Sequence, residues 1–106
     1  MKIVQFVDVL VPLVLSGERT ITWRVNDTRD IKDGDVLSFC WKTGKEFAQA
    51  KVLWAKETVF ANIDELDPAG HQRYKTDEEM YATFTKYYGY PVTKESRVKV
   101  IKFILL

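Results

Sequence analysis

"SGERTITWRV", residues 16–25, combines the signals of a helix end and of a strand. Gly17 is typical of the position just past a helix end, because glycine adopts the left-handed conformation without a steric cost. The following residues alternate between polar and apolar, which is typical of a strand with one face toward a core. The apolar set is Ile21, Trp23 and Val25, and the polar set is Thr20, Thr22 and Arg24. The stretch therefore predicts a helix end followed at once by a strand with one polar face.

A short helix is predicted immediately before this strand, from about Val9 to Ser16. Asp8 is a typical N-cap residue, and Pro12 is tolerated close to the first helical turn. Because the segment is apolar nearly throughout, we expect most of it to be buried.

An antiparallel pair of strands is predicted after the stretch. The turn sequence Asp33-Gly34-Asp35 leads into a strand from Val36 to Lys42, "TGKE" at 43–46 is a hairpin turn, and a second strand continues to about Glu57. Both strands alternate apolar and polar residues. Trp41 and Trp54 share strand faces with apolar residues, as Trp23 does, and we interpret all three tryptophans as core residues.

The last third of the chain predicts two helices and a strand. "NIDELDP", 62–68, indicates one or two helical turns that Pro68 ends. Thr76 and Glu79 have the spacing of a capping box, and the helix that they open ends at Gly89. A strand is predicted from Arg97 to Leu106. The predicted class is α+β with strands dominant, a small mixed β-barrel with helices at its edge.

Length and composition set the remaining limits. A chain of 106 residues with 46% hydrophobic and 29% charged residues predicts a single domain, 1–106, that buries one modest core. The net charge of +1 excludes the strongly cationic nucleic-acid binders, so any nucleic-acid affinity depends on a local patch. Lysines 42, 45, 51, 56, 99 and 102 would form such a patch, unless they are ordinary solubilising residues on outward strand faces.

No cofactor or metal site is predicted. The lone Cys40 and the lone His71 lie far apart in sequence and do not make a ligand set for a metal. Cys40 lies between two aromatic residues and is expected to be a buried structural thiol. The N-terminus does not have the pattern of a signal peptide, and the longest apolar run, Val9 to Leu15, is too short to span a membrane. We therefore expect a cytoplasmic protein without a membrane partner.

Several segments together resemble the ASCH family, whose members have a PUA-like barrel fold. The resemblance rests on "LSGERTITWR", "IKDGDVLSF", "FAQAKV", "TDEEM" and "YYGY" in this order, and it covers essentially the whole chain. It implies a cleft beside the first helix and the polar-faced strand, and association with RNA or modified nucleosides. One bacterial branch of this family consists of acetylcytidine amidohydrolases, in which a lysine, a threonine and a glutamate are proposed to act together.

Only one of these three catalytic groups matches. The threonine falls on Thr22, which is therefore the candidate catalytic residue, but the lysine falls on Arg19 and the glutamate falls near Gln72, within the loop 68–75. Lysine, with a pKa of about 10.4, serves as a base once desolvated, whereas arginine stays protonated. The amide of Gln72 is no base either. A hydrolytic site is then incomplete unless His71, Glu65, Asp67 or a water molecule substitutes.

The resemblance and the chemistry of the side chains also give a set of candidate ligand-binding residues. It comprises Arg19, Thr22, Arg24, His71, Gln72 and Tyr74. The guanidinium group of arginine binds phosphates and base edges through two parallel N–H donors, and tyrosine rings stack on bases. The simpler alternatives are solvated arginines paired with Asp27, Asp30 or Glu46, and a histidine exposed on the surface.

Three functions follow from the sequence. The first is an RNA- or modified-nucleoside-binding domain, and the second is an amidohydrolase of acetylcytidine or a similar acylated nucleoside. The third is a protein-interaction domain that uses the apolar C-terminal segment, Ile101 to Leu106, with a protein partner that the sequence does not identify. Arg19 and Gln72 make binding the preferred hypothesis over catalysis.

Overall fold

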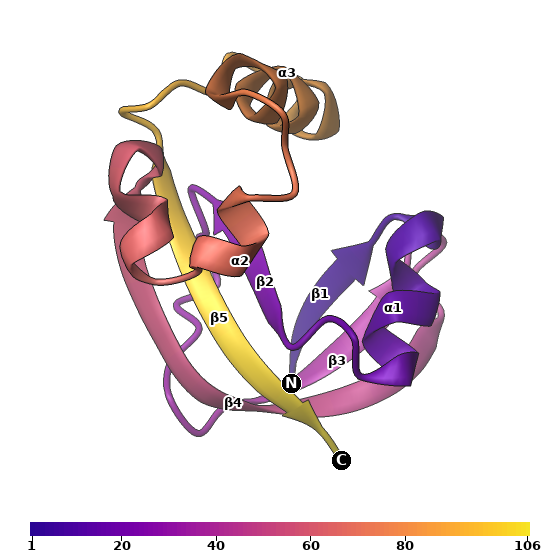
Figure 1. The fold of residues 1–106 in the computed structure, drawn as a ribbon. Helices are drawn as coiled ribbons and strands as arrows, with labels where there is room; N and C mark the ends of the chain where they lie inside the picture. The colour runs from indigo at the N-terminus through magenta and orange to yellow at the C-terminus, as the bar shows by residue number, and fades with distance from the viewer. The chain divides into compact units, whose positions relative to one another are not determined.

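The computed structural model describes residues 1–106 and contains five strands, three α-helices and two 3-10 segments (Figure 1). The elements are β1 (Lys2–Phe6), a 3-10 turn (Asp8–Leu10), α1 (Val11–Ser16), β2 (Ile21–Val25), β3 (Val36–Trp41), β4 (Glu46–Val59), a second 3-10 segment (Phe60–Glu65), α2 (Pro68–His71), α3 (Asp77–Tyr88) and β5 (Arg97–Leu105). The predicted α+β class with strands dominant is confirmed.

The strands are hydrogen-bonded in the order β1-β3-β4-β5-β2. β1 pairs with β3 in parallel, from Lys2 opposite Leu37 to Phe6 opposite Trp41. The sequence analysis placed no strand before the first helix, and this was wrong. β1 has only five residues, and its partner lies 35 positions further along the chain, so no local turn signal marks it.

The predicted hairpin between β3 and β4 is confirmed. The strands are antiparallel, with Leu37 opposite Ala50 and Phe39 opposite Ala48. The register shifts between Phe39 and Cys40, which marks a β-bulge just before the turn. Gly44 has a φ of 92° in the turn, a conformation that favours glycine.

The chain divides into two compact units. Unit 1 comprises Met1–Thr22, Thr28–Ala55 and Ile101–Leu106, and unit 2 comprises Trp23–Asp27 and Lys56–Val100. The core of unit 1 contains aromatic rings from three strands. Phe39 lies at its centre, with ring centroids 4.8 Å from Phe6 and 4.8 Å from Phe103, both in edge-to-face contact. Cys40 is buried and free of disulfides, as expected.

Unit 2 has an aromatic core of its own, which joins β2 to α3. The ring of Trp23 stacks on Phe84 with centroids 5.6 Å apart, and Phe60 meets both rings in edge-to-face contact. Trp23 is 8% exposed, so its prediction as a core residue is confirmed, whereas Trp41 and Trp54 are only half-buried. The core explains why α3 is helical. Met80 and Phe84, four residues apart, lie on its buried face.

The helix ends confirm some of the predicted signals and correct others. Thr76 caps α3, and its hydroxyl accepts a hydrogen bond of 3.1 Å from Glu79 N. Glu79 Oε2 in turn accepts from Lys75 N at 3.0 Å. Pro68 does not only end a helix. It opens α2, with Asp67 as the N-cap.

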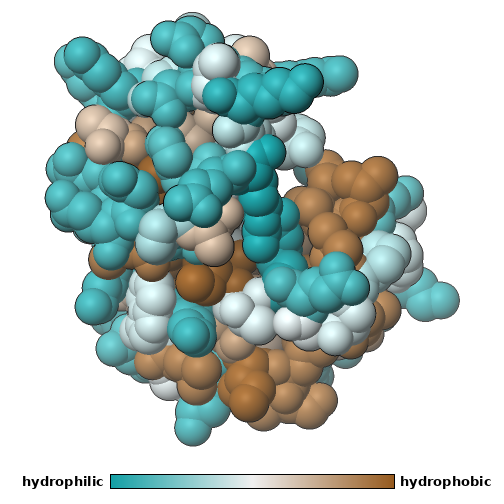
Figure 2. Space-filling model, viewed as in Figure 1, coloured by the Kyte–Doolittle hydropathy of each residue, from teal (hydrophilic) through white to brown (hydrophobic).

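The predicted Asp8 cap and the mostly buried first helix were both wrong. The N-cap positions of the 3-10 turn and of α1 are Val7 and Leu10, and neither side chain caps. Only Val11 and Val14 of α1 are buried, and the exposed apolar side chains nearby contribute to the hydrophobic patch over α1 (Figure 2). Gly17 ends the helix with a φ of 81°, as predicted.

No helix of this structure has the length and apolar content that crossing a membrane requires.

Candidate functional site

The residues after α1 hold Arg19 in a defined position. Gly17 N donates to Val14 O at 3.2 Å, and Arg19 N donates to Leu13 O at 3.0 Å, so the chain stays tied to α1 before β2 begins. The Arg19 side chain is half-buried, and its Nε atom is shielded from solvent. The backbone hydrogen bonds therefore fix the position of the Arg19 Cα atom, and partial burial restricts the movement of its guanidinium group.

The polar face predicted for β2 is not evenly exposed. Thr20 is exposed, Thr22 is only 4% exposed, and Arg24 is half-buried. Because successive side chains of a strand point to opposite faces, burial of both Thr22 and Trp23 means that both faces of β2 are covered at this point. The sequence predicted a strand with one polar face, and the structure buries Thr22, the central residue of that face.

Arg24 lies between two buried residues, Trp23 and Val25. Its Nε atom is shielded from solvent, and the neighbouring Val25 N donates to the hydroxyl of Tyr88 at 3.1 Å. β2 is the last strand in the order of the sheet. The hydrogen bond gives one of its backbone N–H groups an acceptor. The strand segment that carries Arg24 is thereby held by α3.

His71 ends α2, and its imidazole lies beside the carboxylate of Asp77, the first residue of α3. Its Nε2 lies 3.3 Å from Asp77 Oδ1, and its side chain is 33% exposed. With the proton on Nε2, Nδ1 carries the lone pair. This Nδ1 is shielded from solvent and has no hydrogen-bond partner. His71 is therefore partly exposed and partly enclosed.

Gln72 and Tyr74 differ in their surroundings. Gln72 is exposed and forms the C-cap of α2, with its backbone N–H donating to Pro68 O at 3.2 Å. Tyr74 is half-buried, with its ring centroid 6.5 Å from Trp23 and 6.4 Å from Phe84. Of these two residues, only Tyr74 is part of the aromatic core of unit 2.

Asp67 organises this region, although its role was not predicted. Its carboxylate is 8% exposed and accepts two hydrogen bonds, from Trp23 Nε1 at 2.9 Å and from Gly70 N at 3.0 Å. The available signal was "DP" at 67–68, since Asp is favoured at the N-cap and Pro at the first helical position. The carboxylate couples α2, which carries His71, to β2.

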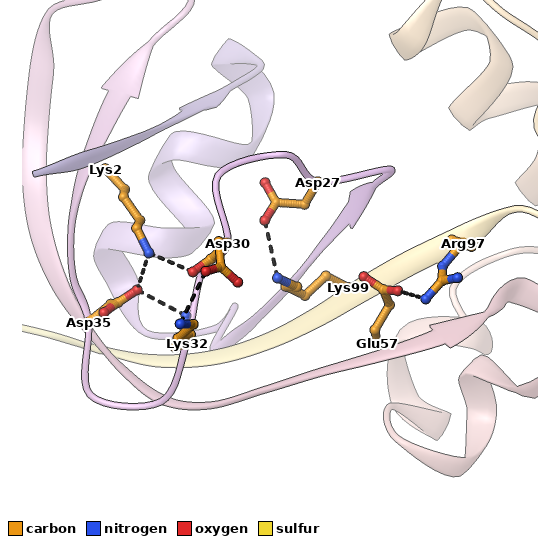
Figure 3. A network of polar contacts seen from close by, with 8 residues as sticks. All are labelled: Lys2, Asp27, Asp30, Lys32, Asp35, Glu57, Arg97 and Lys99. Carbon is orange, nitrogen blue, oxygen red and sulfur yellow. Dashed lines mark hydrogen bonds and ion pairs between the residues drawn. The ribbon is translucent and has the colours of Figure 1, made fainter.

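The carboxylates considered as partners of the arginines contact other residues too. Asp27 lies 3.4 Å from Lys99 Nζ, and Asp30 lies 3.1 Å from Lys32 Nζ (Figure 3). Glu46 accepts from the Ser38 hydroxyl at 2.7 Å. The Lys99 and Asp27 side chains are 11% and 0% exposed, so Lys99 belongs to a buried ion pair. It is not part of an outward basic stripe, contrary to the sequence interpretation.

The candidate residues belong to different units. Arg19 and Thr22 lie in unit 1, whereas Arg24, His71, Gln72 and Tyr74 lie in unit 2. Within unit 2, the structure brings His71 to Asp77 and Tyr74 to Trp23. One cleft that contains residues of both units stays a prediction. No group of three or more His, Cys, Asp or Glu side chains is arranged to hold a metal ion.

Comparison with known proteins gives structural matches only. No protein-family model matches this sequence, and no curated protein matches it. The hypothetical protein PH0355 has a crystal structure that is similar over 100% of both chains, with a TM-score of 0.67 and 22% identity. Protein EF3133 from Enterococcus faecalis V583, of family DUF984, is similar over 100% of this chain and 76% of its own, with a TM-score of 0.68 and 15% identity.

The third similar structure carries the name of the family that the sequence resembles. It is an ASCH domain from Lactobacillus crispatus JV V101, which is similar over 92% of this chain and 70% of its own, with a TM-score of 0.58 and 11% identity. Matches at this level of identity establish the fold. The chain has the fold of an ASCH domain.

Proposed function

We propose that this chain binds RNA or a modified nucleoside through the polar residues of β2 and through the segment that follows α2. The observation that carries the proposal is the position of Arg24, a half-buried arginine between two core residues. Half-burial limits the orientations of a guanidinium, so less entropy is lost when its planar fork binds a phosphate or a base edge.

An aromatic ring of the same unit supplies a second element of such a site. Tyr74 is half-buried against Trp23 and Phe84, which fixes its plane. Single-stranded RNA is commonly bound by stacking its bases on rings of this kind. Arg24 would then bind phosphate or base acceptors, while Tyr74 stacks.

The remaining candidates have roles that suit hydrogen bonding better than catalysis. Gln72 is exposed and offers both a donor and an acceptor, whereas Thr22, at 4% exposure, is less accessible to a ligand. Arg19 stays protonated and adds positive charge. Because the net charge is only +1, we expect few phosphate contacts and therefore a shallow dependence of affinity on salt.

The experiment is a titration of the ¹⁵N-labelled chain with single-stranded RNA, with the four common nucleosides and with acetylcytidine. The proposal predicts saturable shifts of the amide signals of Arg24 and Tyr74. If none of these ligands moves those signals, the chain does not bind through this region.

The His71–Asp77 pair favours one second candidate function, amide hydrolysis of an acylated nucleoside. A carboxylate 3.3 Å from an imidazole orients the ring for proton transfer. Nδ1 is shielded from solvent, so the ring would first have to turn and expose it. The imidazole would then take a proton from a water molecule as the water oxygen attacks the amide carbonyl, and would return it to the amine as the C–N bond breaks. Acetylcytidine would then give acetate and cytidine.

This second candidate has its own experiment. Acetylcytidine is incubated with the protein, and cytidine is measured against the same reaction of His71→Asn. Turnover that disappears in this variant supports hydrolysis, and wild-type turnover no faster than background excludes it. In addition, Arg19→Lys combined with Gln72→Glu restores the residue types of the family's proposed catalytic group and is expected to raise any activity.

A further inference from the structure

An open pocket with a mixed polar and apolar lining lies within unit 2. It has a volume of about 360 Å³ and is lined by Glu57, Thr58, Val59, Asn62 and Arg97. This volume falls within the range of about 300–1,000 Å³ that is usual for small-molecule sites. One apolar side chain and four polar ones form the wall, so the pocket offers both a surface for contact and a set of donors and acceptors.

Backbone hydrogen bonds fix the frame of this pocket. Phe60 N donates to Ser96 O at 3.2 Å, and Ala61 N donates to Lys94 O at 2.9 Å, so the chain before Asn62 is tied to the segment before β5. Arg97 O accepts from Asn26 N at 3.0 Å. The polar side chains therefore project from backbone that is held on both sides.

Arg97 and Glu57, which both line the pocket, form an ion pair (Figure 3). Their side chains are 71% and 36% exposed, and ion pairs this exposed contribute little to stability. A ligand can therefore replace their mutual contact at small cost. The pair also disfavours an anionic ligand, because the Glu57 carboxylate repels an anion that Arg97 alone would attract.

We propose that this pocket binds the edge of a guanine base, either in a free nucleoside or in RNA. The choice of a nucleobase as the ligand rests on the proposed function. The presence of the pocket does not depend on that proposal. Guanine is the common base with two adjacent donors, N1–H and N2–H, which match the two oxygens of the Glu57 carboxylate. Its O6 and N7 acceptors suit the donors of Arg97 and Asn62.

The test follows the side-chain signals of Asn62 and Arg97 in the ¹⁵N-labelled protein during titration with guanosine, inosine, adenosine and cytidine. Guanosine is expected to shift both signals in a saturable way. Inosine lacks the N2 amino group and is expected to bind about tenfold more weakly, since one hydrogen bond to a charged group is lost. Adenosine and cytidine are expected to leave both signals unchanged. If guanosine moves neither signal at millimolar concentration, the proposal is wrong.

Variants distinguish this site from the one on β2. Glu57→Gln should weaken guanosine binding at least tenfold, while the control Glu65→Gln, an exposed carboxylate outside the pocket, should leave it unchanged. Equal guanosine binding by wild type and Glu57→Gln would overturn the assignment. The side-chain signals of Asn62 and Arg97 report this pocket and the amide signal of Arg24 reports the site on β2, so loss of one site does not imply loss of the other.

A further comparison identifies the source of the base. A short single-stranded RNA with one guanine should shift the Asn62 and Arg97 signals at lower concentration than guanosine if the pocket serves RNA, and at the same concentration if it serves a free nucleoside. Either result supports the pocket as a guanine site. An RNA in which inosine replaces the guanine should lose affinity in the first case, and equal binding of the two RNAs would contradict the proposal.

Discussion

Trp23 Nε1 donates a hydrogen bond of 2.9 Å to Asp67 Oδ2, which joins two residues that are 44 positions apart in the sequence. The indole belongs to β2, and the carboxylate caps α2. Both side chains are 8% exposed. A short helix of four residues has little stability of its own, so this contact and the Gly70 N–H bond to the same carboxylate hold α2 in place.

Removing this carboxylate is expected to destabilise the fold. Asp67→Ala leaves the buried indole N–H of Trp23 and the N–H of Gly70 without an acceptor, and this should lower the free energy of unfolding by about 1–3 kcal/mol. The measurement is urea unfolding followed by tryptophan fluorescence. Asp64→Ala, at an exposed position three residues earlier, should change stability by no more than about 0.5 kcal/mol. Equal stability of Asp67→Ala and wild type would show that the hydrogen bonds do not hold α2.

The space around Gly70 leads to a second prediction. A Cβ at this position would lie 2.2 Å from Asp67 Oδ2 and 2.8 Å from Trp23 Cζ2, so at least one buried side chain has to move. Gly70→Ala should lower stability by about 1–3 kcal/mol and should shift the indole N–H signal of Trp23 in a ¹⁵N spectrum. The neighbouring Ala69→Ser, at an exposed position, is the matched control. An unmoved indole signal in Gly70→Ala would contradict the packing described for this site.

Acid stability depends on Asp35 in unit 1. The Lys2 ammonium donates to its carboxylate at 2.7 Å and Lys32 N donates at 2.9 Å, and these hydrogen bonds lower the pKa of Asp35 below its ordinary value of 3.8. A lowered pKa in the folded state means that the contribution to stability is present above pH 3.8 and is lost as the pH falls through the folded-state pKa.

The corresponding experiment compares wild type with Asp35→Asn in urea unfolding between pH 2 and pH 7. Wild type should be the more stable protein at neutral pH, and the difference should shrink below about pH 4. Glu18→Gln, at an exposed position in the same unit, should show no such change. A difference that stays constant across this pH range would show that the ionised carboxylate is not what stabilises the fold.

Local signals in the sequence predicted the elements that they mark. The strand at 21–25, the hairpin turn at 43–46 and the capping box at Thr76 and Glu79 are all confirmed, because each depends on residues close together in the chain. β1 was missed since its parallel partner is distant. The opening of α2 was misread because proline both ends a helix and begins one.

The candidate site was less predictable than the fold. The sequence pattern gives the face of a strand, but it does not give what covers that face, so Thr22 was expected to be more exposed than it is. Long-range pairs such as Lys99 with Asp27 and Trp23 with Asp67 depend on the tertiary fold, and no spacing rule predicts them. The pocket brings Arg97 of β5 to Glu57 and Asn62, which lie 35 or more positions earlier in the chain, so it also depends on the tertiary fold.

The central proposal is that Arg24 binds the ligand, and the affinity of a fluorescent single-stranded RNA at constant salt tests it most directly. Wild type is compared with Arg24→Gln and with Lys86→Gln, which removes an equal charge at an exposed position of α3. The proposal predicts that Arg24→Gln raises Kd about tenfold or more, because a charge-assisted hydrogen bond is lost, while Lys86→Gln changes Kd by less than about threefold. Equal Kd values for wild type and Arg24→Gln, or weakening of the same size in both variants, would contradict it.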